Sequence, residues 1–170
     1  STIPGERMYI NLSRPFSKSL GGSKYWMEAV DDATRMGFTY FMKSRDQIRQ
    51  KLDQLIQQVK TLKYKVMIIR CDNAGENTRH IHDIAREYGM EMEYINSYTP
   101  QMNGVVERRF AVLKLRSQAM LNQADLSPDL RNKLWTEAAR CANLIENITS
   151  SDKQSETPYE LFAGKQSNLY

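Results

Sequence analysis

Cysteine and histidine are scarce in this chain of 170 residues, which contains two of each. His80 and His82 lie two positions apart in a helical pattern, so their side chains point to different faces, and no pair of cysteines lies near them. The sequence therefore predicts no structural zinc site. Cys71 and Cys141 both fall in apolar patterns, which favours two buried thiols over a disulfide.

Long apolar runs are also missing. No stretch approaches the roughly 20 apolar residues of a membrane-spanning helix, and residues 1–7 lack the apolar segment of a secretory signal. We therefore expect an intracellular chain without a membrane partner. The net charge of +4 is mildly basic, which permits a polyanionic partner without requiring one. A hydrophobic content of 41% over 170 residues suits a single domain, 1–170, with a real core.

The first half of the chain alternates between strand and helix patterns. Apolar or alternating runs predict five strands, and helical spacing predicts one helix that reaches Leu62, with Ser44 as its N-cap, and a second over 78–88. The strands are expected over 8–12, 24–31, 37–42, 66–71 and 90–95. Three successive strands followed by alternating helix and strand predict an α/β fold, a five-stranded mixed sheet flanked by α-helices.

The second half is nearly all helical in pattern. Apolar positions predict one helix over 105–122, and Ser127 with Pro128 predicts the start of a further helical stripe that runs to Ile145. Residues 150–155 are polar and are expected to form a loop. From about residue 123 onward, the chain is therefore expected to be a helical extension of the same domain.

Two carboxylates stand beside predicted rigid elements. Asp72 follows the apolar run 66–71 and precedes a turn that contains Asn73, Gly75 and Glu76, while Glu107 lies one turn into the predicted helix. Carboxylates on neighbouring rigid elements suit Mg²⁺, which prefers oxygen ligands and retains several waters. Each also has a simpler interpretation, Asp72 as a turn former and Glu107 as a favourable charge near a helix N-terminus.

Five segments resemble the integrase catalytic core of copia-type LTR retrotransposons, in the order of that family. They are VDDATR at 30–35, DNAGE at 72–76, YTPQMNGVVER at 98–108, WTEA at 135–138 and TPYELF at 157–162. The resemblance implies a ribonuclease H-like fold and a catalytic triad of two Asp and one Glu that binds Mg²⁺ or Mn²⁺. It also implies processing of the element's DNA ends and their joining to target DNA. Asp72 and Glu107 match the second and third members of the triad.

The first member of the triad departs from the family pattern, because the matching position in the strand predicted over 8–12 holds Asn11. An amide oxygen can coordinate a metal but brings no charge, and ligand charge tunes the affinity for hard cations. We therefore expect weak binding of Mg²⁺ or Mn²⁺ and an inactive or impaired integrase. Asp31 and Asp32 fall near the end of the second predicted strand, where the family has the same residues in addition to its triad.

DNA contacts are expected around the triad. Lys114 shares a helix face with Glu107, which could bring it to a phosphate of the DNA end, and Arg108 could contact the DNA backbone. Basic residues at such positions can equally be solvated or paired with carboxylates. Further contacts are expected from the segment before Glu107, which should form a mobile loop and which holds Tyr98, Gln101 and Asn103.

Three functions compete. The chain could be an impaired integrase core, a catalytically dead DNA-binding or assembly module, or a transposase or nuclease of the same fold. The third function is disfavoured, because segments 135–138 and 157–162 fit copia-type integrase cores better than they fit a transposase or nuclease. The family implies a homodimer or higher multimer that acts in the nucleus and in virus-like particles. Full-length integrases of this family carry an N-terminal His/Cys zinc module, and the shortage of these residues here favours a core without it.

Overall fold

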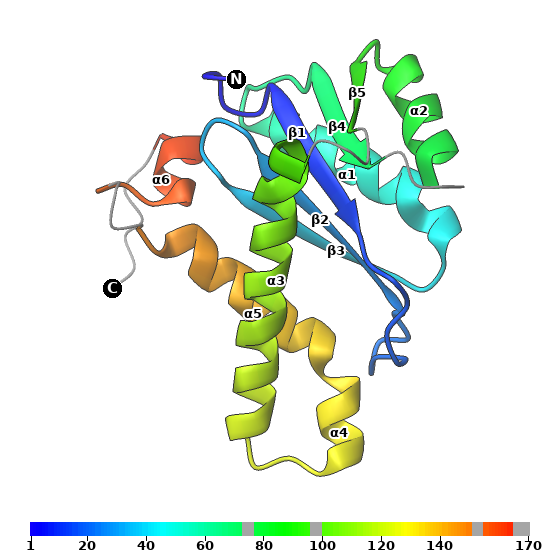
Figure 1. Ribbon diagram of the computed structural model, residues 1–170, viewed down its shortest axis with the longest axis vertical. Coiled ribbons are helices and arrows are strands. Elements are labelled where there is room, and N and C mark those ends of the chain that lie inside the picture. The colour runs from blue at the N-terminus through cyan, green and yellow to red at the C-terminus, as the bar shows by residue number, and fades with distance from the viewer. Residues whose placement is uncertain (73–76, 96–99, 151–154, 165–170) are drawn as a thin grey trace.

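A computed structural model describes residues 1–72, 77–95, 100–150 and 155–164 (Figure 1). Five strands form one sheet in the order β3-β2-β1-β4-β5. β2 pairs antiparallel with β1 and β3, whereas β4 pairs parallel with β1 and β5. The mixed sheet is confirmed, and each predicted strand is found within two residues at either end. The strands are β1 (Arg7–Leu12), β2 (Tyr25–Asp31), β3 (Gly37–Met42), β4 (Ile68–Asp72) and β5 (Glu91–Ile95).

Helices cover both faces of this sheet, and Figure 1 shows α3 crossing in front of β1 with α1 behind the sheet. Within the described residues, no helix is both long enough and apolar enough to cross a membrane. The helices are the 3₁₀ helix η1 (Arg45–Gln47), α1 (Ile48–Thr61), α2 (Asn77–Glu87), α3 (Pro100–Gln123), α4 (Pro128–Lys133), α5 (Trp135–Ile148) and α6 (Pro158–Ala163).

The alternation of side chains along β1 explains why two layers of helix are needed. Met8 and Ile10 belong to a core cluster that includes Leu52 of α1, whereas Tyr9 packs with Val106 of α3. Successive strand residues point to opposite faces, so a strand that is apolar at consecutive positions must be covered on both sides. The central strand therefore lies in the middle of a helix–sheet–helix sandwich.

The entry into α1 differs from the prediction. Ser44 precedes the short helix η1, and its side chain makes no capping hydrogen bond. Instead, the Gln47 side chain accepts a hydrogen bond from the Lys43 backbone N–H at 2.8 Å. Five of the six apolar positions that predicted this helix are buried, as expected from their spacing, whereas Leu62 follows the last helical residue and is exposed.

The start of α3 also differs, and this correction affects the site. The helix begins at Pro100, so Gln101 and Asn103 lie in a helix, and the prediction of a mobile loop at 100–104 was wrong. Proline is favoured in the first turn of a helix because its fixed φ suits the helix and its missing N–H is not needed there. The central Gly104 obscured this start, since glycine inside a helix is unfavourable. Tyr98 lies outside the described residues.

The helical extension consists of two helices where one stripe was predicted. Ser127 accepts a hydrogen bond from the Leu130 N–H, and Pro128 is the first residue of α4, as predicted. The backbone leaves the helical region at Leu134, so α5 starts anew at Trp135. Cys71 is buried, but Cys141 is exposed, so the prediction of two buried thiols was half wrong. The face of α5 that packs inward carries Trp135, Ala139 and Ala142, and at 100° per residue Cys141 falls outside it.

Helix α6 was not predicted, although its segment contributed to the family resemblance. Thr157 and Glu160 form a capping box, Pro158 is the first helical residue, and Gly164 ends the helix with a positive φ. Phe162 is fully buried and contacts the rings of Phe38 and Tyr64 edge-on. This short helix therefore anchors its part of the chain in the main core.

Candidate active site

The register of the two central parallel strands brings the first two predicted triad residues together. Ile10 of β1 is paired with Cys71 of β4, and Asn11 and Asp72 are the next residue on each strand. They therefore occupy adjacent positions at the carboxyl ends of the two strands. On its other side, Asp72 is paired with Ile95 of β5. Beyond its strand position, the side chain of Asp72 lies outside the described part of the structure.

The third predicted triad residue is carried by the turn of α3 that packs over β1. Val106 is fully buried and clusters with Tyr9 of β1 and Val30 of β2. Glu107 is the next residue on the helix and is exposed. Because Tyr9 lies two residues before Asn11 on the same face of the strand, the contact with Val106 holds the Glu107 turn close to that strand end. The structure thus brings the three elements of the predicted triad together.

The predicted metal ligands are two carboxylates and one amide. In the described part of the chain, no group of three or more His, Cys, Asp or Glu residues could hold a metal ion. The predicted set is of a different kind, because it includes the amide of Asn11, and the side chain of Asp72 lies outside the described part of the chain. The assignment of Asn11, Asp72 and Glu107 as metal ligands stays a prediction, and oxygen ligands on rigid elements are the donors that suit Mg²⁺ or Mn²⁺.

A buried carboxylate that the sequence analysis missed lies directly opposite Asn11. Glu28 of β2 is the strand partner of Asn11 and is 0% exposed. Its carboxylate accepts hydrogen bonds from Trp26 Nε1 at 3.2 Å and from Thr39 Oγ1 at 2.6 Å. Burial raises the pKa of Glu28 to about 7, although Arg109 and these two hydrogen bonds act in the opposite direction.

The counter-charge of Glu28 comes from α3, two residues after Glu107. Arg109 Nε donates to Glu28 Oε1 at 3.1 Å, and the Arg109 side chain is only 9% exposed. Its remaining N–H groups donate to the Arg35 carbonyl oxygen at 3.1 Å and to Oδ1 of Asn143 and Asn147 at 2.7 Å each. One guanidinium therefore ties α3 to β2, to the β2–β3 turn and to α5.

Gly37 completes this network because any larger residue would collide with it. A Cβ atom at Gly37 would lie 2.2–2.4 Å from the Arg109 guanidinium. The Gly37 N–H donates to Asn147 Oδ1 at 2.8 Å, and its carbonyl oxygen accepts from Asn147 Nδ2 at 2.8 Å and Asn143 Nδ2 at 3.1 Å. One sequence feature could have pointed to this network. The two asparagines lie four residues apart on α5, and this spacing places both on one helix face.

Asp31 and Asp32 have local partners. Asp31 accepts hydrogen bonds from the Gly5 N–H at 2.7 Å and from Thr34 N–H and Oγ1 at 2.8 and 2.7 Å. Asp32 pairs with Arg7 at 3.2 Å and accepts from Tyr9 Oη at 3.0 Å. These contacts suit carboxylates that shape the end of β2, which agrees with treating both as additional to the triad.

The predicted DNA-binding residues divide into three groups. Arg108 is exposed on α3. Lys114 Nζ lies 5.6 Å from the Phe16 ring centroid and 6.0 Å from that of Phe110, within the range of a cation–π contact. For the others the structure gives no side-chain position; these are Tyr98, Gln101 and Asn103.

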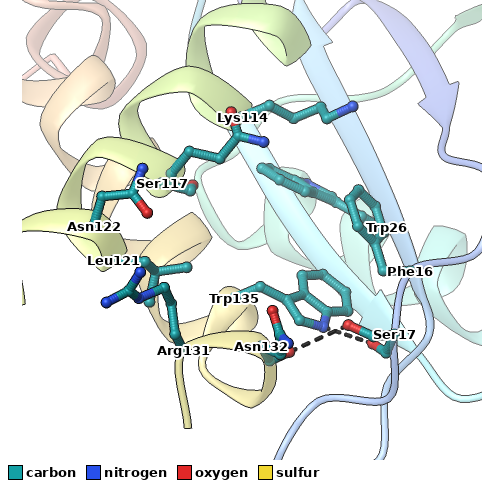
Figure 2. A pocket seen from close by; sticks show the side chains of 11 residues that line it. Phe16, Ser17, Trp26, Lys114, Ser117, Leu121, Asn122, Arg131, Asn132 and Trp135 are labelled. Carbon is teal, nitrogen blue, oxygen red and sulfur yellow. Dashed lines mark hydrogen bonds between the residues drawn. The ribbon is translucent and has the colours of Figure 1, made fainter. Parts of the chain in front are cut away.

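Lys114 also lines a pocket of about 250 Å³, which Figure 2 shows from close by. The pocket lies between residues 16–17, the start of β2, the C-terminal half of α3, the end of α4 and the start of α5. Its walls combine three aromatic rings with two cations and several amides. The lining residues are Phe16, Ser17, Trp26, Lys114, Ser117, Gln118, Leu121, Asn122, Arg131, Asn132 and Trp135.

Comparisons with known proteins found relatives by sequence and by structure. No protein-family model matches the chain. The retrovirus-related Pol polyprotein from transposon TNT 1-94 of Nicotiana tabacum is 32% identical over 165 residues, which cover 94% of this chain. The chain spans only 12% of the length of that polyprotein.

Two solved structures share the fold over nearly the whole chain. The simian T-cell lymphotropic virus intasome in complex with PP2A regulatory subunit B56 gamma matches with a TM-score of 0.73 and 16% identity, over 98% of this chain and 57% of that chain. The HTLV-2 integrase catalytic core domain in complex with magnesium, in a trimeric form, matches with a TM-score of 0.65 and 14% identity, over 94% of this chain and 97% of that one. At these identities the likeness establishes the fold, which is ribonuclease H-like.

Proposed function

This chain is an integrase catalytic core domain of the copia-type retrotransposon family, and we propose that its site is built for metal-dependent processing and joining of DNA ends. The observation that carries the proposal is the strand register. It puts Asn11 beside Asp72 at the ends of two parallel strands, under the turn of α3 that bears Glu107. Two strand ends and one helix would then supply the three triad positions that the family resemblance implies.

The donor set suits a hard divalent cation but is short of one charge. Mg²⁺ or Mn²⁺ bound at such a site polarises a phosphoryl oxygen and lowers the pKa of an attacking water. Asp72 and Glu107 would hold the cation through charged oxygens, while Asn11 offers a neutral amide oxygen. A neutral ligand offsets less of the cation's charge than a carboxylate does. We therefore propose that metal binding is weak and that strand transfer is impaired.

The proposed substrates are the DNA ends of the element and its target DNA. Exposed Arg108 and the side chain of Lys114 stand on the same helix as Glu107, where they could neutralise phosphates near the reacting one. One of the structural neighbours is an intasome and another is a trimeric core, which supports a proposal that this chain also acts as a homodimer or higher multimer. Virus-like particles and the nucleus are the proposed places of action.

A second candidate function follows from Asn11 itself. A core that lacks one triad carboxylate could serve as a catalytically dead module that binds DNA or contributes to assembly. Loss of one preorganised charged group that stabilises a transition state typically lowers a rate by about 10²–10³-fold. Asn11 should cost at least that much if its position bridges the metal site.

The experiment that tests the proposal measures nicking and joining of labelled DNA duplexes by three proteins, in Mg²⁺ and in Mn²⁺. The unmodified chain should be nearly inactive, with any trace of activity favouring Mn²⁺. Asn11→Asp should recover activity, and Asn11→Asp combined with Asp72→Asn should lose it again. Robust Mg²⁺-dependent joining by the unmodified chain would contradict the impaired site. A folded Asn11→Asp protein that binds DNA but never cuts it would favour the assembly module.

A further inference from the structure

The pocket at the far end of α3 has a rigid aromatic wall. Phe16 stacks on Trp135, with ring centroids 4.7 Å apart at an angle of 25°, and its centroid lies 6.3 Å from that of Trp26. Trp135 is held in place because its indole N–H donates to the Ser17 carbonyl oxygen at 2.9 Å. Figure 2 shows these rings on one side of the pocket and the side chains of α3 on the other. A preorganised ring surface suits a flat aromatic ligand.

The charges around the pocket favour an anionic ligand. Its lining includes the cations Lys114 and Arg131 but no Asp or Glu. Arg131 is held only loosely, because its Nη2 donates to the Leu126 carbonyl oxygen at 3.5 Å and its buried Nε has no partner in the described part of the chain. Turning toward a ligand would therefore cost this side chain little hydrogen bonding.

Amide side chains occupy the remaining wall. Gln118 and Asn122 come from α3, and Asn132 comes from α4. Each amide offers both hydrogen-bond donors and an acceptor, which is the chemistry that reads the edge of a nucleobase. A stacking surface, cations and amides in one pocket together match the parts of a nucleotide more closely than those of a simple anion or an apolar ligand.

The position of the pocket on α3 connects it to the candidate active site. Lys114 follows Glu107 by seven residues on the same helix face, which is roughly 10 Å along the axis at 1.5 Å per residue. A DNA strand in B form places one phosphate about every 3.4 Å along its axis. A strand that follows α3 from the active site would thus bring roughly its third phosphate to Lys114.

We propose that this pocket binds one unpaired nucleotide of the DNA end, about three positions from the reacting phosphate. Its base lies against Phe16 and Trp135 and its phosphate lies near Lys114. The nucleotide must be unpaired because a base within a duplex is covered on both faces and on its pairing edge. This proposal rests on the proposed function, since it assigns a substrate contact to the same DNA-binding surface.

Tryptophan fluorescence reports on this pocket, because the only two tryptophans of the chain, Trp26 and Trp135, both line it. The chain is titrated with a short single-stranded oligonucleotide and with the same strand made abasic. Binding of the normal strand should quench the fluorescence to saturation. The abasic strand should bind on the order of 10- to 100-fold more weakly, as expected for the loss of one base–aromatic stack.

Three variants separate the pocket from general DNA binding. Phe16→Leu keeps an apolar side chain but removes the stacking ring, and should weaken oligonucleotide binding about 10-fold. Lys114→Ala should also weaken it. The matched control is Arg116→Ala, which removes the same charge from α3 but lies outside the pocket, where Arg116 pairs with Glu146. This control should bind the oligonucleotide nearly as well as the unmodified chain.

Fluorescence anisotropy of a labelled duplex, recorded in parallel, distinguishes the failure of this inference from that of the proposed function. If the duplex binds but the tryptophan signal does not change, or normal and abasic strands bind equally, the pocket inference is overturned and the proposed function stands. Equal losses of affinity in Lys114→Ala and Arg116→Ala would also overturn the inference, because they would indicate that any positive charge on α3 contributes equally to DNA binding. If neither DNA binds at low salt, both proposals fail.

Discussion

Replacing Arg109 by methionine should destabilise this protein strongly, because it leaves Glu28 buried without its counter-charge. Methionine keeps an unbranched side chain of similar reach, so packing changes little. Breaking a buried ion pair by removing one partner typically costs about 3–5 kcal/mol. A domain of this size loses about 2–4 °C of melting temperature per kcal/mol. The expected fall in melting temperature is therefore roughly 6–20 °C.

The loss should also depend on pH, with a sign that follows from Glu28. Burial raises its pKa in the folded protein to about 7 from a reference value of 4.5. The folded state thus binds a proton that the unfolded state has released, so the stability contributed by this group falls as the pH rises through that window. Arg109 lowers the pKa of Glu28, so without it the window extends above about pH 7. The cost of the substitution should then grow above about pH 7, by at most about 1.4 kcal/mol per pH unit.

Urea unfolding followed by tryptophan fluorescence at about pH 6 and about pH 8 measures both effects. The control is the double variant Glu28→Gln, Arg109→Met, in which the uncompensated charge is gone. It should recover part of the lost stability at pH 8, and the difference between the two pH values should largely disappear. A loss below about 1 kcal/mol in Arg109→Met, or a loss that is the same at both pH values, would refute the argument from the buried pair.

Three further predictions concern other parts of the same region. Gly37→Ala should lower the melting temperature, because its Cβ would lie 2.2–2.4 Å from the Arg109 guanidinium. Gly104→Ala should instead raise stability by about 0.5–1 kcal/mol, because among the described residues no atom lies within 4 Å of the added Cβ. Thermal unfolding that ranks the two variants the other way would contradict this packing. Calorimetric titration with Mn²⁺ should give tighter or additional binding for Asn11→Asp, and identical curves would mean that Asn11 does not ligate metal. DNA affinity should fall steeply with salt, and Lys114→Ala should reduce the slope of log affinity against log salt by about one; an unchanged slope would remove Lys114 from the phosphate contacts.

Most of the sheet could be predicted from the sequence, because each strand depends on a pattern of residues that are close together in the chain. The strand 37–42 was predicted with the bounds that the structure gives, since its apolar and aromatic residues are bounded by turn residues. The same local logic predicted that Asp72 follows a buried strand. Where local signals conflict, prediction was wrong: Pro100 and Gly104 suggested a loop, but the proline is the first residue of α3 and the glycine is tolerated inside it.

The candidate site was predictable for a different reason. Asn11, Asp72 and Glu107 were assigned from their positions within motifs that resemble one family, and the strand register puts the first two at adjacent positions of neighbouring strands. No periodicity or charge pattern would have singled out Asn11, an ordinary polar residue in a short strand. The chemistry expected at these positions therefore depends on the motif match, and the structure adds that the elements bearing them meet.

The sequence by itself determined the order of the five strands, the first two helices and the motifs that identify the family, because each of these depends on residues close together in the chain. Only the tertiary structure decided which distant groups meet. Glu28 and Arg109 are 81 residues apart, and the pocket takes its walls from four separate parts of the chain. The pKa of Glu28, the fit of Gly37 and the aromatic wall beside Lys114 arise from burial and contact in three dimensions, which no local pattern records.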